Sequence, residues 1–356
     1  MDGEYQKGPD QRTVKEPEDS FVPTPMQVAQ SLRRFAEPPL RAAYHVAREV
    51  VLYPRAQRIL RAYEAHYQEA RRVYASKGHT MKQALTQVLV RAFSADKPDA
   101  LLTLPDRYGP CVERIRRYAQ AQLERSACCW LFPKPPTGPF PEAVRDIPAV
   151  REGAVIAVQL KDWLSVEGLD ELCDIVLPQL EANVYGTHLI VDKVYVYRNL
   201  VSRAKEQVSW TWHYDNHPPG ITKLMVYLTD VTEQTGPFEY LRSARTKEAL
   251  YRTPTPLSGY GRISPSRLQR YLAEGYESCR VTGPCGTLLF FDENVVHKAN
   301  VAKSGVRDAV VLQIRPATFR PERYIDSRWT GSFQHRDFNA DPYDTVPRLK
   351  EGMLSG

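Results

Sequence analysis

The sequence predicts a mainly β protein with added helices, in which about eight short strands form a closed or sandwiched antiparallel architecture. Short apolar or alternating segments separated by turn residues recur between residues 151 and 318, whereas helical patterns are concentrated before residue 131. Between these two parts, five prolines fall within residues 133–141, which excludes both a helix and the interior of a sheet.

The N-terminal part divides into an arm and a helical region. Residues 1–25 are polar and contain four prolines, so we expect a flexible arm. Residues 26–131 are expected to be mainly helical, with helices at Ala42–Lys77 (interrupted at Pro54), at Met81–Phe93 after a Thr80 cap, and at Pro110–Arg125. Tyr63, Tyr67 and Tyr74 are expected to pack in the core. Arg114, Arg116, Arg117 and Arg125 are expected to lie on a solvated helix face.

The remainder is expected to form a proline-rich linker (132–150), the core (151–318) and a C-terminal extension (319–356), whose Trp329 and Phe333 would pack along the outside of the core. The strands we expect are Ala154–Leu160, Leu189–Val201, Val208–Asp215, Lys223–Asp230, Phe238–Leu241, Ser278–Thr282, Gly286–Asp292 and Val306–Arg315. The helices we expect in the core are Gly168–Ala182 and a short one near Ser266–Glu274, inside a variable loop at 242–277.

The bulk properties favour a cytoplasmic protein. The formal net charge of +6 comes from 48 basic and 42 acidic residues, which we interpret as a mixed, solvated surface. The six cysteines form no CxxC pair, and we expect reduced thiols. Residues 1–7 lack the apolar segment of a signal peptide, and no run of eighteen apolar residues occurs, so we expect no membrane partner.

A histidine and a carboxylate stand two positions apart in the segment Trp212-His213-Tyr214-Asp215. On a strand, residues i and i+2 point to the same face, so both side chains are expected to point toward one place. The following Asn216-His217-Pro218-Pro219-Gly220 excludes a strand interior, which places the pair at a strand end beside a loop.

A third ligand is available downstream. His297 follows the predicted strand that ends at Asp292, and Arg307 lies ten residues beyond His297. Two histidines and one carboxylate, with open positions opposite, are the ligand set of non-haem Fe(II) oxygenases. A planar guanidinium such as that of Arg307 binds a carboxylate through two charge-assisted hydrogen bonds.

These motifs, together with Tyr227-Leu228-Thr229-Asp230-Val231 and Thr235-Gly236-Pro237-Phe238, resemble the phytanoyl-CoA dioxygenase family of Fe(II)/2-oxoglutarate oxygenases over roughly Val155–Ala317. The resemblance implies a double-stranded β-helix (jelly-roll, cupin-like) core flanked by helices. It also implies Fe(II) bound by His213, Asp215 and His297, with 2-oxoglutarate and O2 as co-substrates and Arg307 on the far carboxylate of 2-oxoglutarate. Because Asp215 is present, the resemblance argues against halogenation.

Other polar residues are assigned around this set. Tyr197 and Asn199, on the preceding strand, are expected to contact the keto-acid end of 2-oxoglutarate or to serve the strand itself. Arg315 is the rival of Arg307 on the same strand face. His217 is expected to contact substrate or a ligand. Ala299 and Ala309 replace the serine or threonine that some family members use to seat the co-substrate, while His188 and His335 have no supporting pattern.

The resemblance implies hydroxylation of an unactivated C–H bond of a small-molecule metabolite, with decarboxylation of 2-oxoglutarate to succinate and CO2. Desaturation or ring closure by the same chemistry is the first alternative, and a catalytically inactive metal-binding scaffold is the second. The basic charge suggests nucleic-acid dealkylation as a third, which we disfavour. We expect a monomer or a homodimer.

Overall fold

The computed structural model describes residues 61, 64–79, 90–94, 101–133, 141–163, 165–215, 217, 220–252 and 261–325. All of the described residues belong to one unit, which extends from Pro54 to the C-terminus. Within these ranges, no helix combines the length and the hydrophobicity needed to cross a membrane. The six cysteines are all free thiols.

Seven strands form the larger sheet. All of its neighbouring strands are antiparallel. Their order is β1 (Val90–Phe93), β10 (Leu288–Asp292), β6 (Thr222–Tyr227), β12 (Arg307–Ala317), β4 (His188–Asn199), β3 (Ala157–Leu160) and β2 (Cys129–Phe132). The sheet is built around β12 and β4, which pair along their whole lengths with one bulge between Gln313 and Ile314.

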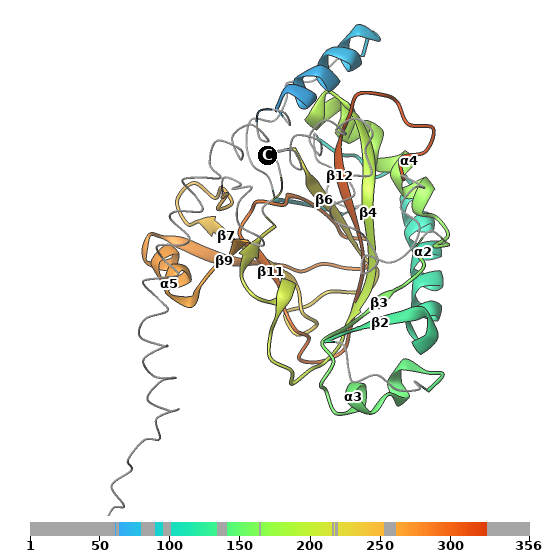
Figure 1. Ribbon diagram of the computed structural model, residues 1–356, viewed down its shortest axis with the longest axis vertical. Helices are drawn as coiled ribbons and strands as arrows, with labels where there is room; N and C mark the ends of the chain where they lie inside the picture. The colour runs from blue at the N-terminus through green and yellow to red at the C-terminus, as the bar shows by residue number, and fades with distance from the viewer. Residues whose placement is uncertain are drawn as a thin grey trace, which may run out of the picture. The chain divides into compact units, whose positions relative to one another are not determined.

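Five shorter strands form a second antiparallel sheet, in the order β8 (Gly261–Arg262), β5 (His213–Tyr214), β11 (His297–Ala299), β7 (Phe238–Ser243) and β9 (Tyr276–Val281). It lies on the side of β4 and β12 opposite to the helices (Figure 1). Two packed antiparallel sheets whose neighbours are mostly far apart in sequence form the predicted double-stranded β-helix, and this prediction is confirmed.

Helices cover the outer face of the larger sheet. α2 (Tyr108–Leu123) and α4 (Leu169–Leu180) lie side by side against it, and α4 continues into a π-helical turn at Glu181–Tyr185 (Figure 1). The other helices of the described residues are α3 (Pro148–Arg151), a helical stretch at residues 64–76, and α5 (Pro265–Ala273), which contacts β9 of the smaller sheet. Three 3-10 turns lie at Ser126–Cys128, Val144–Asp146 and Val208–Trp210.

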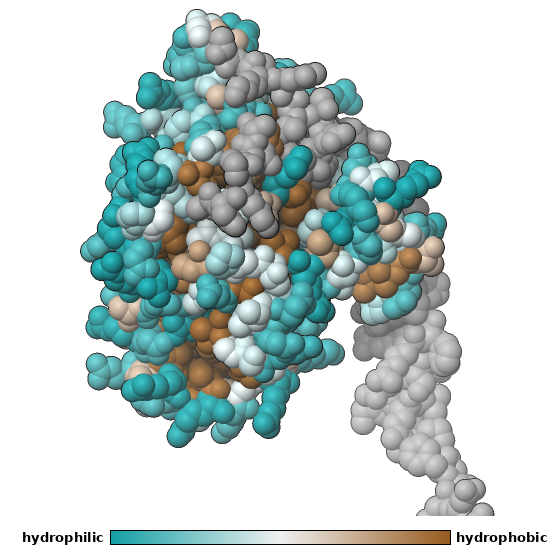
Figure 2. All heavy atoms as spheres, turned by 180° about the vertical axis from the view of Figure 1, so that it is seen from behind, coloured by the Kyte–Doolittle hydropathy of each residue, from teal (hydrophilic) through white to brown (hydrophobic). Residues whose placement is uncertain are grey.

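Strand β12 separates two hydrophobic cores because its side chains alternate between two buried faces. Val310, Leu312 and Ile314 pack with residues of α2 and α4, whereas Ala309 and Val311 pack with residues of the second sheet. Few large hydrophobic side chains of the described residues are exposed, and Figure 2 shows a mostly hydrophilic surface with hydrophobic areas toward the middle and lower part of one face.

Most predicted elements of the core are confirmed within a few residues, among them α4, β4, β10, β12 and the short helix α5. Tyr67 packs against the core and Tyr74 is buried, as expected. The arginines of α2 bind carboxylates at the surface: Arg116 and Arg117 pair with Glu113, in agreement with a solvated face. Tyr63, Trp329, Phe333 and His335 lie outside the described residues.

Two predictions are wrong. The segment Val90–Phe93, expected to end a helix, is strand β1 and pairs with β10, because pairing at a sheet edge outweighs a helical hydrophobic pattern. The segment Val208–Trp210, expected to be extended, is a 3-10 turn in which Val208 has φ 51°. The strands β1 and β2, at and before the boundary expected at 131, belong to the same sheet as the core strands.

Candidate active site

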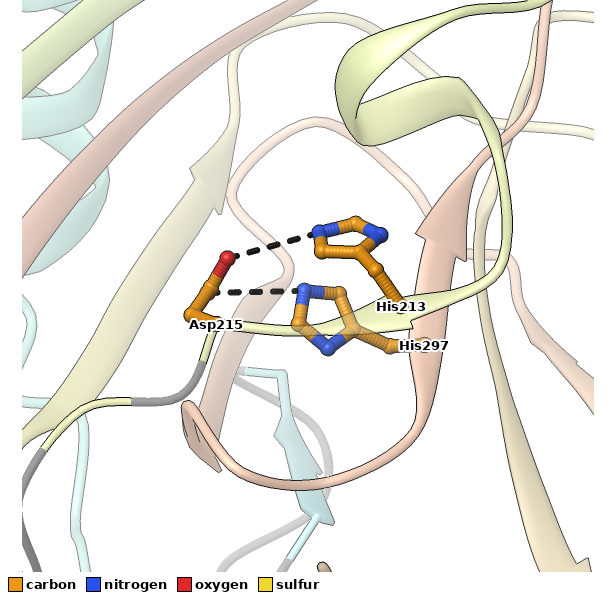
Figure 3. A group of neighbouring side chains, drawn as sticks. All are labelled: His213, Asp215 and His297. Carbon is orange, nitrogen blue, oxygen red and sulfur yellow. Dashed lines mark ion pairs between the residues drawn. The ribbon is translucent and has the colours of Figure 1, made fainter. Parts of the chain in front are cut away.

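Three side chains able to hold a metal ion meet where two short strands pair. His213 opens β5 and His297 opens β11, and the two residues lie directly opposite each other. Asp215 follows β5, and its carboxylate faces both rings (Figure 3). Its Oδ1 lies 3.4 Å from Nε2 of His213, and its Oδ2 lies 3.7 Å from Nε2 of His297. The candidate ligand atoms all lie within 4.8 Å of one another, so the structure brings the predicted triad together.

Backbone carbonyls fix the orientation of both imidazoles. Nδ1 of His213 lies 2.7 Å from the carbonyl oxygen of Thr211. Nδ1 of His297 lies 2.7 Å from the carbonyl oxygen of Val295. A carbonyl oxygen only accepts, so each Nδ1 carries the proton and donates it. Each Nε2 therefore keeps a lone pair on the side of Asp215, which is the form in which imidazole binds a metal.

The electrostatics of the cluster also suit a metal ion. Burial alone would raise the pKa of Asp215, but the ammonium of Lys223 and the two imidazoles lower it well below its usual range. Burial and the neighbouring His213 lower the pKa of His297 to about 3. Asp215 is thus an anion and His297 a neutral base at neutral pH. Two imidazole nitrogens and a carboxylate oxygen fit a divalent ion such as Fe(II).

Arg307, the predicted partner of 2-oxoglutarate, is completely buried at the start of β12. Its Nη2 donates to the hydroxyl of Tyr197 at 3.1 Å, and its guanidinium lies 5.5 Å from the centre of the Tyr197 ring. Its Nε and Nη1 have no hydrogen-bond partner among the described residues. Since a buried cationic donor without a partner is costly, these two N–H groups fit a carboxylate ligand.

The other predicted co-substrate residues separate into two groups. Tyr197 lines the cavity described below and bonds Arg307. Asn199 is buried, and its amide is engaged by the protein: Oδ1 accepts from the indole of Trp210 at 3.0 Å, and Nδ2 donates to the carbonyl of Asn300 at 2.6 Å. Asn199 therefore serves the packing between strands. Arg315 is also buried on β12, and neither arginine lines the cavity itself, but Arg307 bonds the cavity residue Tyr197, whereas Arg315 lies beyond the bulge.

Glycine in the Thr235-Gly236-Pro237-Phe238 motif allows this packing. Gly236 has φ 81°, a conformation that residues with a Cβ rarely adopt. A Cβ at this position would collide with the carbonyl of Asn300 and crowd the amide of Asn199. The motif therefore lets the chain before β7 lie close to the end of β4 and to the segment after β11.

A cavity of about 430 Å³ lies between the two sheets, and His213, Asp215 and His297 form part of its wall. Aromatic and aliphatic side chains form much of the remaining wall, including Tyr195, Trp210, Met225, Phe238, Phe291 and Val311. A volume of this size suits a small organic ligand together with a co-substrate. Ala299 also lines the cavity, so no hydroxyl stands at that position.

One end of the cavity is polar. Gln313 of β12 lies directly opposite Lys193 of β4 on one side and Lys223 of β6 on the other, so the three form a row across the sheet. Gln313 donates to Asp192 at 3.2 Å. His217 also lines the cavity, and burial together with Lys193 lowers its pKa to about 4.

Sequence reasoning missed Lys223 and Glu293. The ammonium of Lys223 contacts the carboxylate of Asp215 and lies 3.8 Å from Oε1 of Glu293. Glu293 is completely buried, and its Oε2 lies 3.0 Å from Nε2 of His217. The available signal was a single lysine inside the otherwise apolar segment Ile221–Leu228, where a charge is expensive unless it has a partner.

Comparison with known proteins gives partial matches. No family model matches the chain. Over 170 residues the chain is 27% identical to L-proline trans-4-hydroxylase from Streptomyces griseoviridis, a stretch that makes up 40% of this chain and 62% of that protein. The chain therefore spans less than two thirds of the length of this relative.

Solved structures with similarity to the chain include two that contain iron. The epimerase SnoN, in complex with Fe3+, alpha ketoglutarate and nogalamycin RO, is 15% identical with a TM-score of 0.43, over 72% of this chain and 87% of that one. EctD from S. alaskensis with bound Fe is 13% identical with a TM-score of 0.40, over 68% of this chain and 78% of that one. At these values, function has to be inferred from the residues of the present chain.

Proposed function

We propose that this chain is a non-haem Fe(II)- and 2-oxoglutarate-dependent dioxygenase that hydroxylates a C–H bond of a small-molecule metabolite. The observation that supports it most is the cluster of His213, Asp215 and His297, with its ligand atoms within 4.8 Å of one another in the wall of a cavity. Two imidazoles and one carboxylate hold a divalent iron and leave positions open for a co-substrate and O2.

The chain's own residues prepare this centre. The carbonyls of Thr211 and Val295 hold the Nδ1 protons, so both rings offer Nε2 to the metal. Asp215 contributes the negative charge that a divalent cation requires. When bound, iron and 2-oxoglutarate supply the reactivity toward O2, with decarboxylation of 2-oxoglutarate to succinate and CO2.

In this proposal Arg307 holds the far carboxylate of 2-oxoglutarate. The support is its complete burial together with two N–H groups that lack a partner among the described residues. Tyr197 accepts from the third nitrogen and keeps the guanidinium in place. A guanidinium and a carboxylate form two parallel charge-assisted bonds, so the contact orients the co-substrate as well as binding it.

The primary substrate would then occupy the polar end of the cavity. Gln313 is six residues from Arg307 on the same strand, which corresponds to roughly 20 Å. A five-carbon diacid is too short to fill both ends. The activity named for the Streptomyces relative makes L-proline the first compound to test. A cytoplasmic location and a monomeric or homodimeric state stay predictions.

The test is release of succinate by the purified chain with Fe(II), ascorbate, 2-oxoglutarate and O2. We expect iron-dependent succinate formation that a true substrate stimulates. A product heavier by one oxygen atom indicates hydroxylation, whereas loss of two hydrogen atoms indicates the alternative of desaturation or ring closure. No succinate above a metal-free control, with L-proline or with a panel of other small carboxylic acids, would contradict the proposal and favour the inactive scaffold.

A further inference from the structure

One buried lysine contacts the triad of His213, Asp215 and His297 without belonging to it. Lys223 lies on β6 of the larger sheet, whereas Asp215 follows β5 of the smaller one. Their side chains meet across the interior, where the ammonium contacts Oδ2 of Asp215. This oxygen also faces Nε2 of His297 at 3.7 Å, while Oδ1 faces His213 at 3.4 Å. The lysine thus occupies one side of the carboxylate that the two imidazoles share.

Glu293 also lies near the lysine. It lies in the turn between β10 and β11, is completely buried, and places Oε1 3.8 Å from the ammonium. Its backbone carbonyl accepts the N–H of Asp215 at 2.9 Å. Glu293 is therefore connected to Asp215 twice, once through its backbone and once through Lys223. These contacts link the segment that carries His213 to the segment that carries His297.

This arrangement is poorly explained by stability alone. Removing a lysine and a carboxylate from water costs free energy that their attraction often fails to recover, and apolar replacements of both partners are commonly as stable or more stable. Met225, two residues along the same strand face, shows that an unbranched apolar side chain fits this wall. A charge is retained at 223, beside a carboxylate whose orientation determines whether a metal can bind.

We propose that Lys223 is a positioning residue for the metal-binding carboxylate. Its ammonium fixes the rotamer of Asp215 so that the carboxylate is presented to the metal between the two imidazoles. Residues that hydrogen-bond a metal ligand orient it, and their loss typically weakens metal affinity about 10- to 100-fold. This inference rests on the metal centre of the proposed function and extends it to residues outside the triad.

The test measures Co(II) binding to the metal-free protein by anaerobic calorimetry, together with the visible absorption spectrum of the Co(II) complex. Lys223→Met keeps the length of the side chain and removes the charge. We expect its affinity for Co(II) to fall about 10- to 100-fold and its spectrum to change. Thermal unfolding of the metal-free variant should show a loss of stability, since the buried carboxylate of Asp215 is left without its cation, so Co(II) binding is compared well below the melting temperature of the variant. Lys303→Met, at an exposed position, is the matched control and should bind like the wild type.

The outcomes are separable. Equal Co(II) affinity and identical spectra for wild type and Lys223→Met would overturn the positioning role while leaving the proposed function intact. Failure of the wild type itself to bind Co(II) would overturn the metal centre, and the positioning role with it. If Lys223→Met does not fold, Lys223→Gln takes its place, with a weakening in the same direction expected because the charge is again removed.

Discussion

The two sheets differ in the length of their strands and in what they carry. β4 and β12 extend over 12 and 11 residues and are backed by helices. β5 and β11, which carry the two histidines of the triad, have 2 and 3 residues. A short strand cannot position a ligand by its ladder alone. In the short sheet, the carbonyls of Thr211 and Val295 orient the two histidines, and Lys223 contacts Asp215. The long sheet supplies the scaffold, Arg307 and part of the cavity wall. Changes in the two regions should therefore have different effects.

The largest effect is expected for Asp215→Ala. The variant loses the only carboxylate of the triad, so we expect no detectable metal binding and no succinate formation. Calorimetry with Co(II) and the succinate assay measure the two properties, and Asp106→Ala at an exposed position is the control. Wild-type succinate production by Asp215→Ala would refute its role as a ligand.

Arg307→Ala tests the contribution of the long sheet to the chemistry. Two charge-assisted hydrogen bonds of about 1.5 kcal/mol each would be lost, so we expect the KM for 2-oxoglutarate to rise about 100-fold. Arg315→Ala, on the same strand, should change that KM little. A larger rise of the KM for 2-oxoglutarate in Arg315→Ala than in Arg307→Ala would show that Arg315, and not Arg307, binds the co-substrate.

Leu312→Ala tests the scaffold on the face away from the site. Leu312 is completely buried beneath the helices, and a cavity left at such a position typically costs about 2–5 kcal/mol of unfolding free energy. We expect this loss in denaturant unfolding, with Co(II) affinity preserved. Phe319→Ala, at an exposed side chain, should change stability by less than about 0.5 kcal/mol. Loss of metal affinity in Leu312→Ala would show that the two regions are not separable.

The smallest effect concerns pH and Glu181, after α4. Burial raises its pKa to about 7, from an ordinary value of about 4.3. The folded state holds the proton more tightly, so this contribution to stability is present in acid and is lost as the pH rises from about 4.3 to 7. Glu181→Gln removes it. We expect the melting temperature of the variant, relative to that of the wild type, to rise between pH 5 and pH 8. A difference in melting temperature that does not change with pH would contradict the raised pKa of Glu181.

The sequence predicted the triad because its members stand at recognisable spacings. His213 and Asp215 are two residues apart, and Arg307 follows His297 at a spacing that one strand can place. The long strands β4 and β12 were predicted for a similar reason, since their hydrophobic patterns are extended enough to show a period.

The remainder depends on contacts that a pattern does not contain. β8 and β11 are too short to show any period, and β1 owes its conformation to pairing with β10. An asparagine at position 199 is typical of a ligand contact, but the side-chain amide of Asn199 is hydrogen-bonded to the indole of Trp210 and to a backbone carbonyl. Lys223 and Glu293 are 70 residues apart in the sequence, and they are close in space only because β6 and the turn before β11 lie together in the fold.

The most direct test is the position of the metal itself. Crystals grown anaerobically with Fe(II) and 2-oxoglutarate should show one anomalous peak at the iron edge. We predict that this peak lies about 2.0–2.2 Å from Nε2 of His213, Nε2 of His297 and a carboxylate oxygen of Asp215, with density for a diacid extending from it toward Arg307. Iron bound elsewhere, or a triad without a peak in fully loaded protein, would contradict the account.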